Sequence, residues 1–280
     1  MLFVGIDLAW SDGGGSRRPR ETGAVIVDAQ GDVLHADWTV GVVDTVRWVE
    51  ERIPRHTGSL IFVDAPLVVN NHVGQRTCET QIGQRYGRWK VSANSTNTGS
   101  RHLAGVELRQ RLTTLGWCYS DGCAGPPQGG RNLSECYPYT AIVGVEELGY
   151  CKERPRYKRR PKGTTPSEFR LIRARECDEL IRRINRIPST ASPLNLQSHP
   201  ATRSLTKESS PLQDAKYKHR EDLLDAVIRA WTAMIWASWG RERCQVLGCD
   251  ESAPGGLRAT IVAPARAEQR RPAVGMGSRK

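Results

Sequence analysis

Apolar residues in the first quarter of the chain come in short runs separated by turn-forming residues. Such runs are typical of buried strands, and two of them flank residues 29–32 (AQGD) as in an antiparallel hairpin. Pro54 ends a helical pattern, and Pro66 terminates the strand that follows it. The predicted elements are strands at residues 2–8, 23–28 and 33–40, a helix at 44–52 and a strand at 59–64.

Longer segments with helical periodicity follow, and one of them begins with a capping box. Thr165 is placed as the N-cap, Pro166 as the first helical residue and Glu168 as the reciprocal partner. The mixture of strands and helices predicts an α/β protein. The further predicted elements are helices at 73–86, 103–115, 166–187 and 220–239, a short strand at 132–137, and short strands or coils at 245–248 and 257–263.

Acidic residues end the buried strands. Asp7 and Asp64 each close an apolar run, where burying an unpaired carboxylate costs several kcal/mol. Each therefore needs a cation, a capping role or a function. Glu135 is a third acid of this kind, but its strand is short and open to solvation. Sites of α/β sheets gather at the carboxyl ends of strands, which makes these acids candidate site residues.

The last predicted helix has two adjacent stripes. One broad apolar face should cover the sheet, and beside it lie Asp222, Asp225, Arg229 and Trp236. The two aspartates are three residues apart and therefore neighbours on the helix surface. At the start of the helix they have an ordinary alternative explanation, because the helix dipole favours negative charge there.

Taken together, these acids indicate a metal centre. Four or five carboxylates from distant segments could converge, and Mg²⁺ and Mn²⁺ prefer oxygen ligands. Two such ions about 3.5–4 Å apart can activate the attacking water and stabilise the leaving oxygen in phosphodiester hydrolysis. The predicted metal-binding and catalytic residues are Asp7, Asp64, Glu135, Asp222 and Asp225.

Charge and composition point to a nucleic-acid partner. The chain of 280 residues carries a formal net charge of +11, which favours polyanions. Residues 154–162 (RPRYKRRPK) form a basic run that either holds phosphates or is a solvated loop. Trp89, Tyr157 and Trp236 could stack on bases, although core packing is the more frequent role of aromatic residues.

The location of the protein is predicted from what the sequence lacks. It has no apolar run of membrane-spanning length and no secretory signal at its start, so we expect a soluble, cytoplasmic protein without membrane contacts. The eight cysteines are expected to be reduced thiols. Zinc binding by Cys118 with Cys123, or by Cys244 with Cys249, is the alternative.

Several short motifs resemble a known family. Asp7 within GIDLAW, the hairpin, the strand ending in Asp64 and the late acidic helix resemble the RNase H-like fold. The sequence Asp222 to Ala226, preceded by His219, looks like the C-terminal motif of RuvC-type resolvases. The chain as a whole resembles the domain-of-unknown-function 429 family, which is regarded as predicted nucleases. The shared motifs are GIDLAW, VDAPL, R-x-C-E from Arg76, ECYP from Glu135, YKRR from Tyr157 and DLLDA.

The resemblance implies a mixed five-stranded sheet, with the first three strands antiparallel, flanked by helices. It implies one domain over residues 1–264 with insertions at 66–131 and 138–218, of which 188–211 is expected to be flexible. The tail 265–280 is expected to be disordered. Asp7 would bridge both ions, and Lys158, Arg159 and Arg76 would contact substrate phosphates. Arg76 and Glu79 have a structural alternative as a helix pair.

The resemblance and the acids favour a divalent-metal-dependent nuclease, and two alternatives stay open. Actin-like ATPases also begin with Gly-Ile-Asp, and residues 12–15 could serve as one of their two phosphate loops, but a second such loop and a Walker A sequence are missing. A non-catalytic nucleic-acid-binding protein could keep the same fold with its acids too far apart to share a metal ion.

Overall fold

The computed structural model describes residues 1–9, 20–100, 103–187, 192–251, 253 and 256–270. Within these ranges six strands form a mixed sheet in the order β3-β2-β1-β4-β6-β5. The first three strands are antiparallel as predicted, whereas β4, β6 and β5 run parallel to β1. The strands are β1 Leu2–Asp7, β2 Glu21–Val27, β3 Val33–Val40, β4 Ser59–Val63, β5 Cys118–Tyr119 and β6 Arg131–Glu135.

The mixed α/β architecture flanked by helices is confirmed, but the sheet has one strand more than predicted. The additional strand, β5, contains only two residues and lies at the edge beside β6. Such a short strand has no alternating pattern that a sequence could reveal. A separate antiparallel ribbon, β7 Cys244–Leu247 with β8 Ile261–Pro264, joins the end of the sheet through a bridge between Cys136 and Val262.

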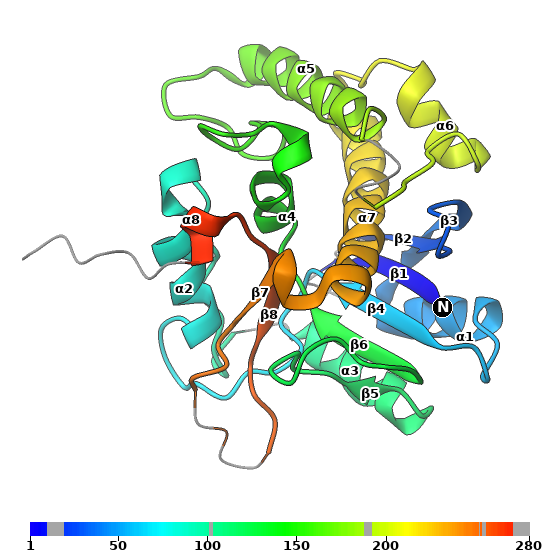
Figure 1. Ribbon diagram of the computed structural model, residues 1–280. Coiled ribbons are helices and arrows are strands. Elements are labelled where there is room, and N and C mark those ends of the chain that lie inside the picture. Colours follow the sequence, from blue (N-terminus) through cyan, green and yellow to red (C-terminus); the bar gives the residue numbers. More distant parts are fainter. Residues whose placement is uncertain (10–19, 101–102, 188–191, 252, 254–255, 271–280) are drawn as a thin grey trace, which may run out of the picture.

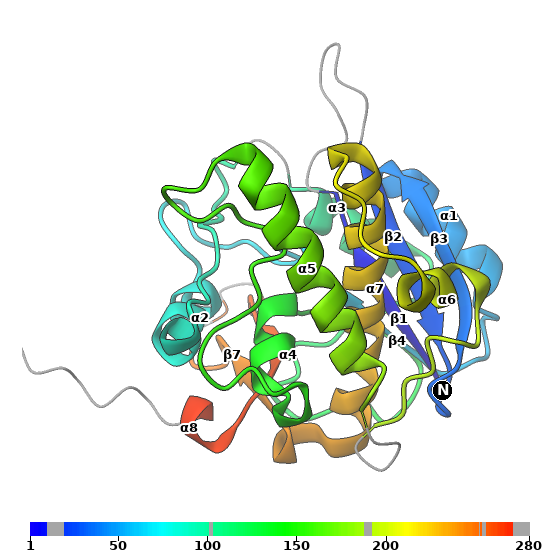
Figure 2. The ribbon, with the colours of Figure 1, turned by 90° about the horizontal axis from the view of Figure 1, so that it is seen from above.

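Helices cover both faces of the sheet. Alternate residues of β1 divide between two cores, with Phe3 facing α7 and both Val4 and Ile6 facing α1 and α3. Figures 1 and 2 show α7 against the sheet, with α4 and α5 beyond it and α1 on the opposite side. The helices are α1 Gly41–Arg52, α2 Thr77–Tyr86, α3 Ala104–Thr114, α4 Pro138–Gly144, α5 Pro166–Ile184, α6 Pro200–Lys207, α7 Asp214–Trp239 and α8 Ala267–Arg270.

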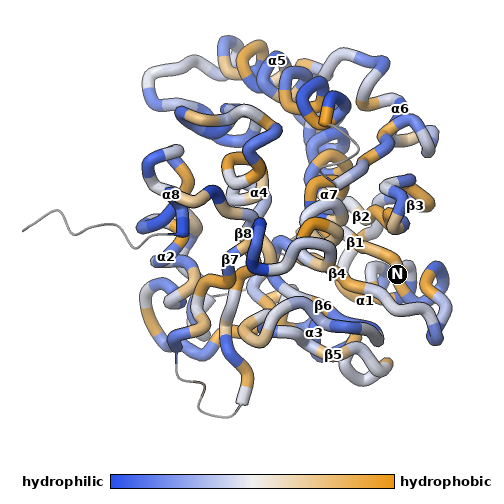
Figure 3. Tube along the Cα trace, in the orientation of Figure 1, coloured by the Kyte–Doolittle hydropathy of each residue, from blue (hydrophilic) through white to orange (hydrophobic). Residues whose placement is uncertain are grey.

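Helix α7 is the centre of the larger core and approaches the sheet very closely. Figure 3 shows apolar residues along it, and most of its side chains are buried. The approach depends on two glycines. A Cβ atom at Gly5 would overlap the carbonyl oxygen of Ala226, and one at Gly23 would overlap that of Asp222. Since Asp7 and Gly23 are paired across β1 and β2, this contact brings Asp222 beside Asp7.

Two segments that were expected to be irregular contain helices. The stretch predicted to be flexible includes α6, which Arg220 binds through the carbonyl oxygens of Leu205 and Glu208. The tail 265–280, which was predicted to be disordered, includes α8. Residues 271–280 of this tail lie outside the described ranges. The capping box that begins α5 at Thr165 is confirmed. In the described residues, no helix is both long and apolar enough to span a bilayer.

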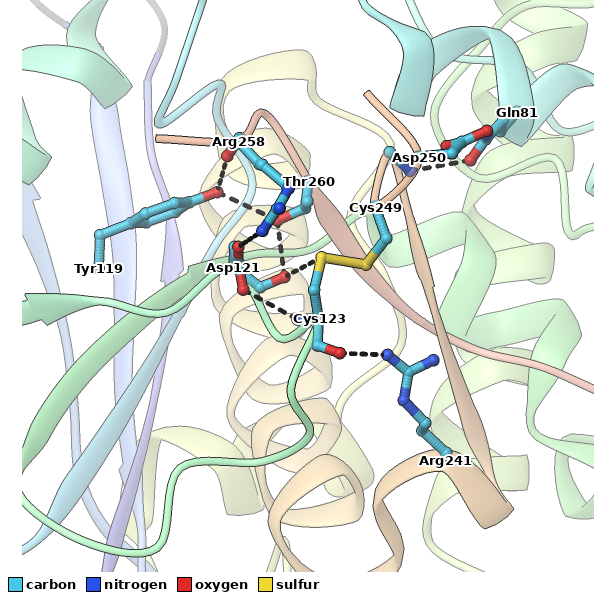
Figure 4. Close-up of a disulfide and its surroundings, with 10 residues drawn as sticks. Gln81, Tyr119, Asp121, Cys123, Arg241, Cys249, Asp250, Arg258 and Thr260 are labelled. Carbon is cyan, nitrogen blue, oxygen red and sulfur yellow. Dashed lines mark hydrogen bonds and ion pairs between the residues drawn. A yellow bond between two sulfur atoms is a disulfide. The ribbon is translucent and has the colours of Figure 1, made fainter. Parts of the chain in front are cut away.

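A disulfide joins Cys123 to Cys249, so the expectation of reduced thiols is wrong for this pair. Neither of the two pairs proposed for zinc is linked, and the other six cysteines are free. Figure 4 shows how the bond ties the loop after β5 to the segment after β7. Arg241 also binds the carbonyl oxygen of Cys123, and Thr260 binds that of Asp121. The crosslink therefore secures the β7–β8 ribbon to the edge of the sheet.

Removing this disulfide is expected to destabilise the fold. The bond closes a loop with a sequence separation of 126 residues, for which the chain-entropy model gives a stabilisation of about 5 kcal/mol. Disulfides typically stabilise proteins by about 2–4 kcal/mol. Urea unfolding of Cys123→Ser should show a loss in this range. Cys118→Ser, which removes an exposed free thiol, is the control and should unfold like the wild type. Equal unfolding curves for all three proteins would contradict the crosslink.

Candidate functional site

Asp7 and Asp64 lie at the carboxyl ends of the adjacent strands β1 and β4 and face α7. The link between them is Arg229, whose Nη2 is 2.8 Å from Asp7 Oδ1 and 2.5 Å from Asp64 Oδ2. The Arg229 side chain is completely buried. The predicted convergence of these two strand-end acids therefore occurs, but around a cation that the protein itself supplies.

Asp222 and Asp225 of α7 join the same cluster. Asp222 is hydrogen-bonded to Asp7, and Lys218 Nζ is 2.5 Å from Asp222 Oδ1. Asp225 is fully buried, where it accepts a hydrogen bond from Tyr157 at 2.8 Å and pairs with Lys158. Because α7 begins at Asp214, eight residues before Asp222, neither aspartate is at the helix start. Capping is thus no longer an explanation for them.

Glu135 is not part of this cluster. It shares a strand face with Leu133, which belongs to the core on the side of α1 and α3, so the alternation of β6 directs it away from α7. Its carboxylate receives two hydrogen bonds from Arg76, at 2.8 and 2.6 Å, and one from the backbone of Leu67. The pattern NLSEC shows only that Leu133 and Glu135 share a face, because they are two residues apart; which face this is depends on the folded sheet.

Arg76, predicted to bind phosphate, is buried beside Glu135. Its guanidinium also binds Glu79 and the carbonyl oxygen of Val68. Glu79 in turn accepts hydrogen bonds from the backbones of Arg76 and Thr96. These contacts match the structural alternative, in which the pair fixes the start of α2. The network joins α2, β6 and the loop before α2.

The basic run is anchored to the protein rather than fully solvated. Tyr157 is fully buried, and Arg154 lies over the ring of Tyr139 and binds the carbonyl oxygen of Lys90. Arg159 remains exposed and binds Asn94. Burial also excludes base stacking by Tyr157, and likewise by Trp89 and Trp236. Lys158 therefore reaches the acids because its neighbour Tyr157 is fixed in the core.

A cavity of about 280 Å³ opens beside the acids. Among its charged lining residues are Asp7, Asp64 and Asp222 together with Lys158 and Lys218. Sequence reasoning did not identify Lys218 or Glu221 as site residues. The signal for Lys218 was its position four residues before Asp222, since side chains at this spacing meet on a helix.

Proton sharing dominates the electrostatics of Asp7 and Asp222. Burial opposes ionisation of Asp7, but the charges of Arg229, Lys158 and Lys218 outweigh it and lower its pKa to about 2. Burial and the neighbouring Asp7 charge raise the pKa of Asp222 to about 9, although Lys218 acts against this. Two ionised carboxyl groups in contact repel each other, so the folded state favours a proton held between Asp7 and Asp222.

Asp222 should make the metal-free protein less stable as the pH rises. Its pKa is about 9 in the folded state and about 3.9 in the unfolded state, so between these values the folded state binds one proton more. The free energy of unfolding then falls with increasing pH, by at most about 1.4 kcal/mol per pH unit. Urea unfolding with EDTA between pH 5 and 8 measures this slope. Asp222→Asn should have a distinctly shallower slope, and identical slopes would contradict the shared proton.

The donor set suits a divalent cation. At the cavity and directly behind it, six carboxyl groups face four cations: the acids are Asp7, Glu21, Asp64, Glu221, Asp222 and Asp225, and the cations are Arg20, Lys158, Lys218 and Arg229. If all were ionised, two negative charges would be in excess, which is the charge that Mg²⁺ or Mn²⁺ neutralises. Within the described ranges, no three acidic, histidine or cysteine side chains are already arranged as a metal-binding group. Arg229 lies between two of the acids that such a group would need.

Comparison with known proteins identifies the family of the chain. No curated protein and no solved structure matches it. A family model described as "Protein of unknown function (DUF429)" matches residues 5–252. This range contains Asp7, Asp64, Asp222 and Asp225 and most of both cores. The chain therefore belongs to the DUF429 family.

Proposed function

We propose that this protein is a divalent-metal-dependent nuclease with an RNase H-like fold. The observation that carries the proposal is the contact between Asp7, at the end of β1, and Asp222, on α7. A proton-sharing carboxyl pair beside a cavity is a site that a divalent cation would stabilise by replacing the proton. The antiparallel β1–β3 and the late helix across the sheet support the fold assignment.

In this proposal, Asp7 and Asp222 hold the cation, and Mg²⁺ or Mn²⁺ is the expected metal. The ion supplies Lewis-acid stabilisation for charge that develops on the scissile phosphate. Arg229 holds the carboxylates of Asp7 and Asp64 in fixed orientation. Tyr157 and Lys158 hold Asp225 behind them.

The cations at the cavity would bind the substrate. The Lys218 side chain is about half-exposed, and Lys158 and Arg20 also line the cavity. Their charges can pair with the backbone phosphates of DNA or RNA, which makes binding sensitive to salt. Arg159, on the exposed part of the basic run, would extend this contact beyond the cavity.

A cleavage assay tests the proposal. The purified chain is incubated with single-stranded, duplex, hybrid and branched nucleic acids in Mg²⁺, Mn²⁺ or EDTA. We expect at least one substrate to be cut with either metal and none with EDTA. Asp222→Asn should be inactive, while the exposed, distant Glu107→Gln should cut like the wild type. Absence of cleavage for every substrate, or equal cleavage by Asp222→Asn, would refute the proposal, and ATP hydrolysis instead would favour a phosphotransferase.

A further inference from the structure

Arg229 differs from Lys218, the half-exposed cation of the site, in that it cannot move into solvent. Its side chain is completely buried on α7, next to Ala230, where Gly5 allows the helix to approach the sheet closely. Lys218, by contrast, has a side chain that is 49% exposed, so its ammonium can move into solvent. A guanidinium also stays protonated in proteins, so its charge is permanent.

One atom of Arg229 holds the position between two acids. Its Nη2 binds Asp7 Oδ1 and Asp64 Oδ2 together and is 3.9 Å from Asp225 Oδ2. A metal ion shared by Asp7 and Asp64 would have to displace this nitrogen or lie against a positive charge in a buried environment. The side of Asp7 that meets Asp222 opens to the cavity, and the cation paired with Asp222 there, Lys218, has a half-exposed side chain that can give way to a metal ion.

We propose that Arg229 takes the place of the second ion of a two-metal centre, so that this chain binds one divalent cation, held by Asp7 and Asp222. This inference rests on the proposed metal-dependent function. It replaces the two ions expected from the sequence with one. Asp64 then serves Arg229 and not the metal. The guanidinium supplies fixed positive charge on one side of Asp7, and the ion supplies exchangeable charge on the other.

Counting Mn²⁺ on the full chain tests the inference without measuring activity. Titration followed by electron paramagnetic resonance should give one bound ion per wild-type chain. Arg229→Gln removes the charge and should bind two. If Arg229→Gln does not fold, the asparagine variants provide the test. Asp64→Asn should keep one ion with a dissociation constant within about tenfold of the wild type, whereas Asp222→Asn should weaken binding at least about 100-fold.

The outcomes separate this inference from the proposed function. Two ions on the wild type would overturn the inference and leave nuclease activity intact as a proposal. A single ion that is lost in Asp64→Asn would overturn it as well, as would a count of one in a folded Arg229→Gln. One ion on a chain that cuts no nucleic acid would refute the nuclease and support the metal count. A wild type that binds no Mn²⁺ would refute both.

Discussion

Asp7→Asn is expected to reduce nucleic-acid cleavage at least about 1000-fold. A metal ion contributes several kcal/mol to stabilising the transition state, and each 1.4 kcal/mol is a factor of ten in rate. Asparagine keeps the size of the side chain but removes the charge that attracts the cation, and it also weakens the hold of Arg229 on this strand. Initial rates with saturating Mn²⁺ measure the loss.

The control for this variant is Glu51→Gln, an exposed residue of α1 on the opposite side of the sheet. It removes one negative charge from the chain without approaching the site, so its rate should equal that of the wild type. Thermal unfolding of both variants shows whether the fold is kept. If folded Asp7→Asn retains more than about a tenth of the wild-type rate, Asp7 is not a metal ligand in the reaction.

Among substitutions that add one methyl group to the sheet, Gly5→Ala is expected to lower the free energy of unfolding the most. The new Cβ would overlap the backbone of α7 at Ala226 and Ala230, and a backbone cannot move aside as a flexible side chain can. Overpacking typically costs about 1–3 kcal/mol and sometimes more, and we expect about 3 kcal/mol here. Urea unfolding at neutral pH measures the difference.

Gly83→Ala is the matched control, because a Cβ at this position of α2 meets no atom within 4 Å. It should leave stability unchanged or raise it by up to about 1 kcal/mol, since alanine is the better helix former. If Gly5→Ala unfolds like the wild type, α7 must be able to withdraw from β1. The contact between Asp7 and Asp222 would then not be set by the glycines.

The parts of the site that sequence could predict are those with a local pattern. Asp7 and Asp64 follow apolar strands, and Asp222 and Asp225 lie beside an apolar helix face, so their convergence follows from the α/β order. Alternation also puts Glu135, which we predicted as a ligand, on the same face of β6 as Leu133, but only the folded structure shows that this face is directed away from α7.

Other features depend on contacts between distant segments, which no local pattern records. The sequence places Arg229 next to the aspartates on the helix, but its pairing with β1 and β4 depends on the close approach of α7 to the sheet that Gly5 allows. Helix α7 begins at residue 214 instead of the predicted residue 220, and this difference also depends on a contact between distant segments. Residues 214–219 are mostly polar, and Tyr217 fixes them by donating a hydrogen bond to the carbonyl oxygen of Tyr157. The disulfide likewise joins residues 126 positions apart.

The distribution of the acids along the chain also constrains when the site can first exist. Asp7 is synthesised long before its partner Asp222, and α7 must pack on β1 and β2 before the two carboxyl groups meet. A nascent chain without α7 therefore has strand-end acids but no complete centre. If the protein cuts nucleic acid, a nascent chain gains that activity only after α7 has been synthesised and has packed on the sheet.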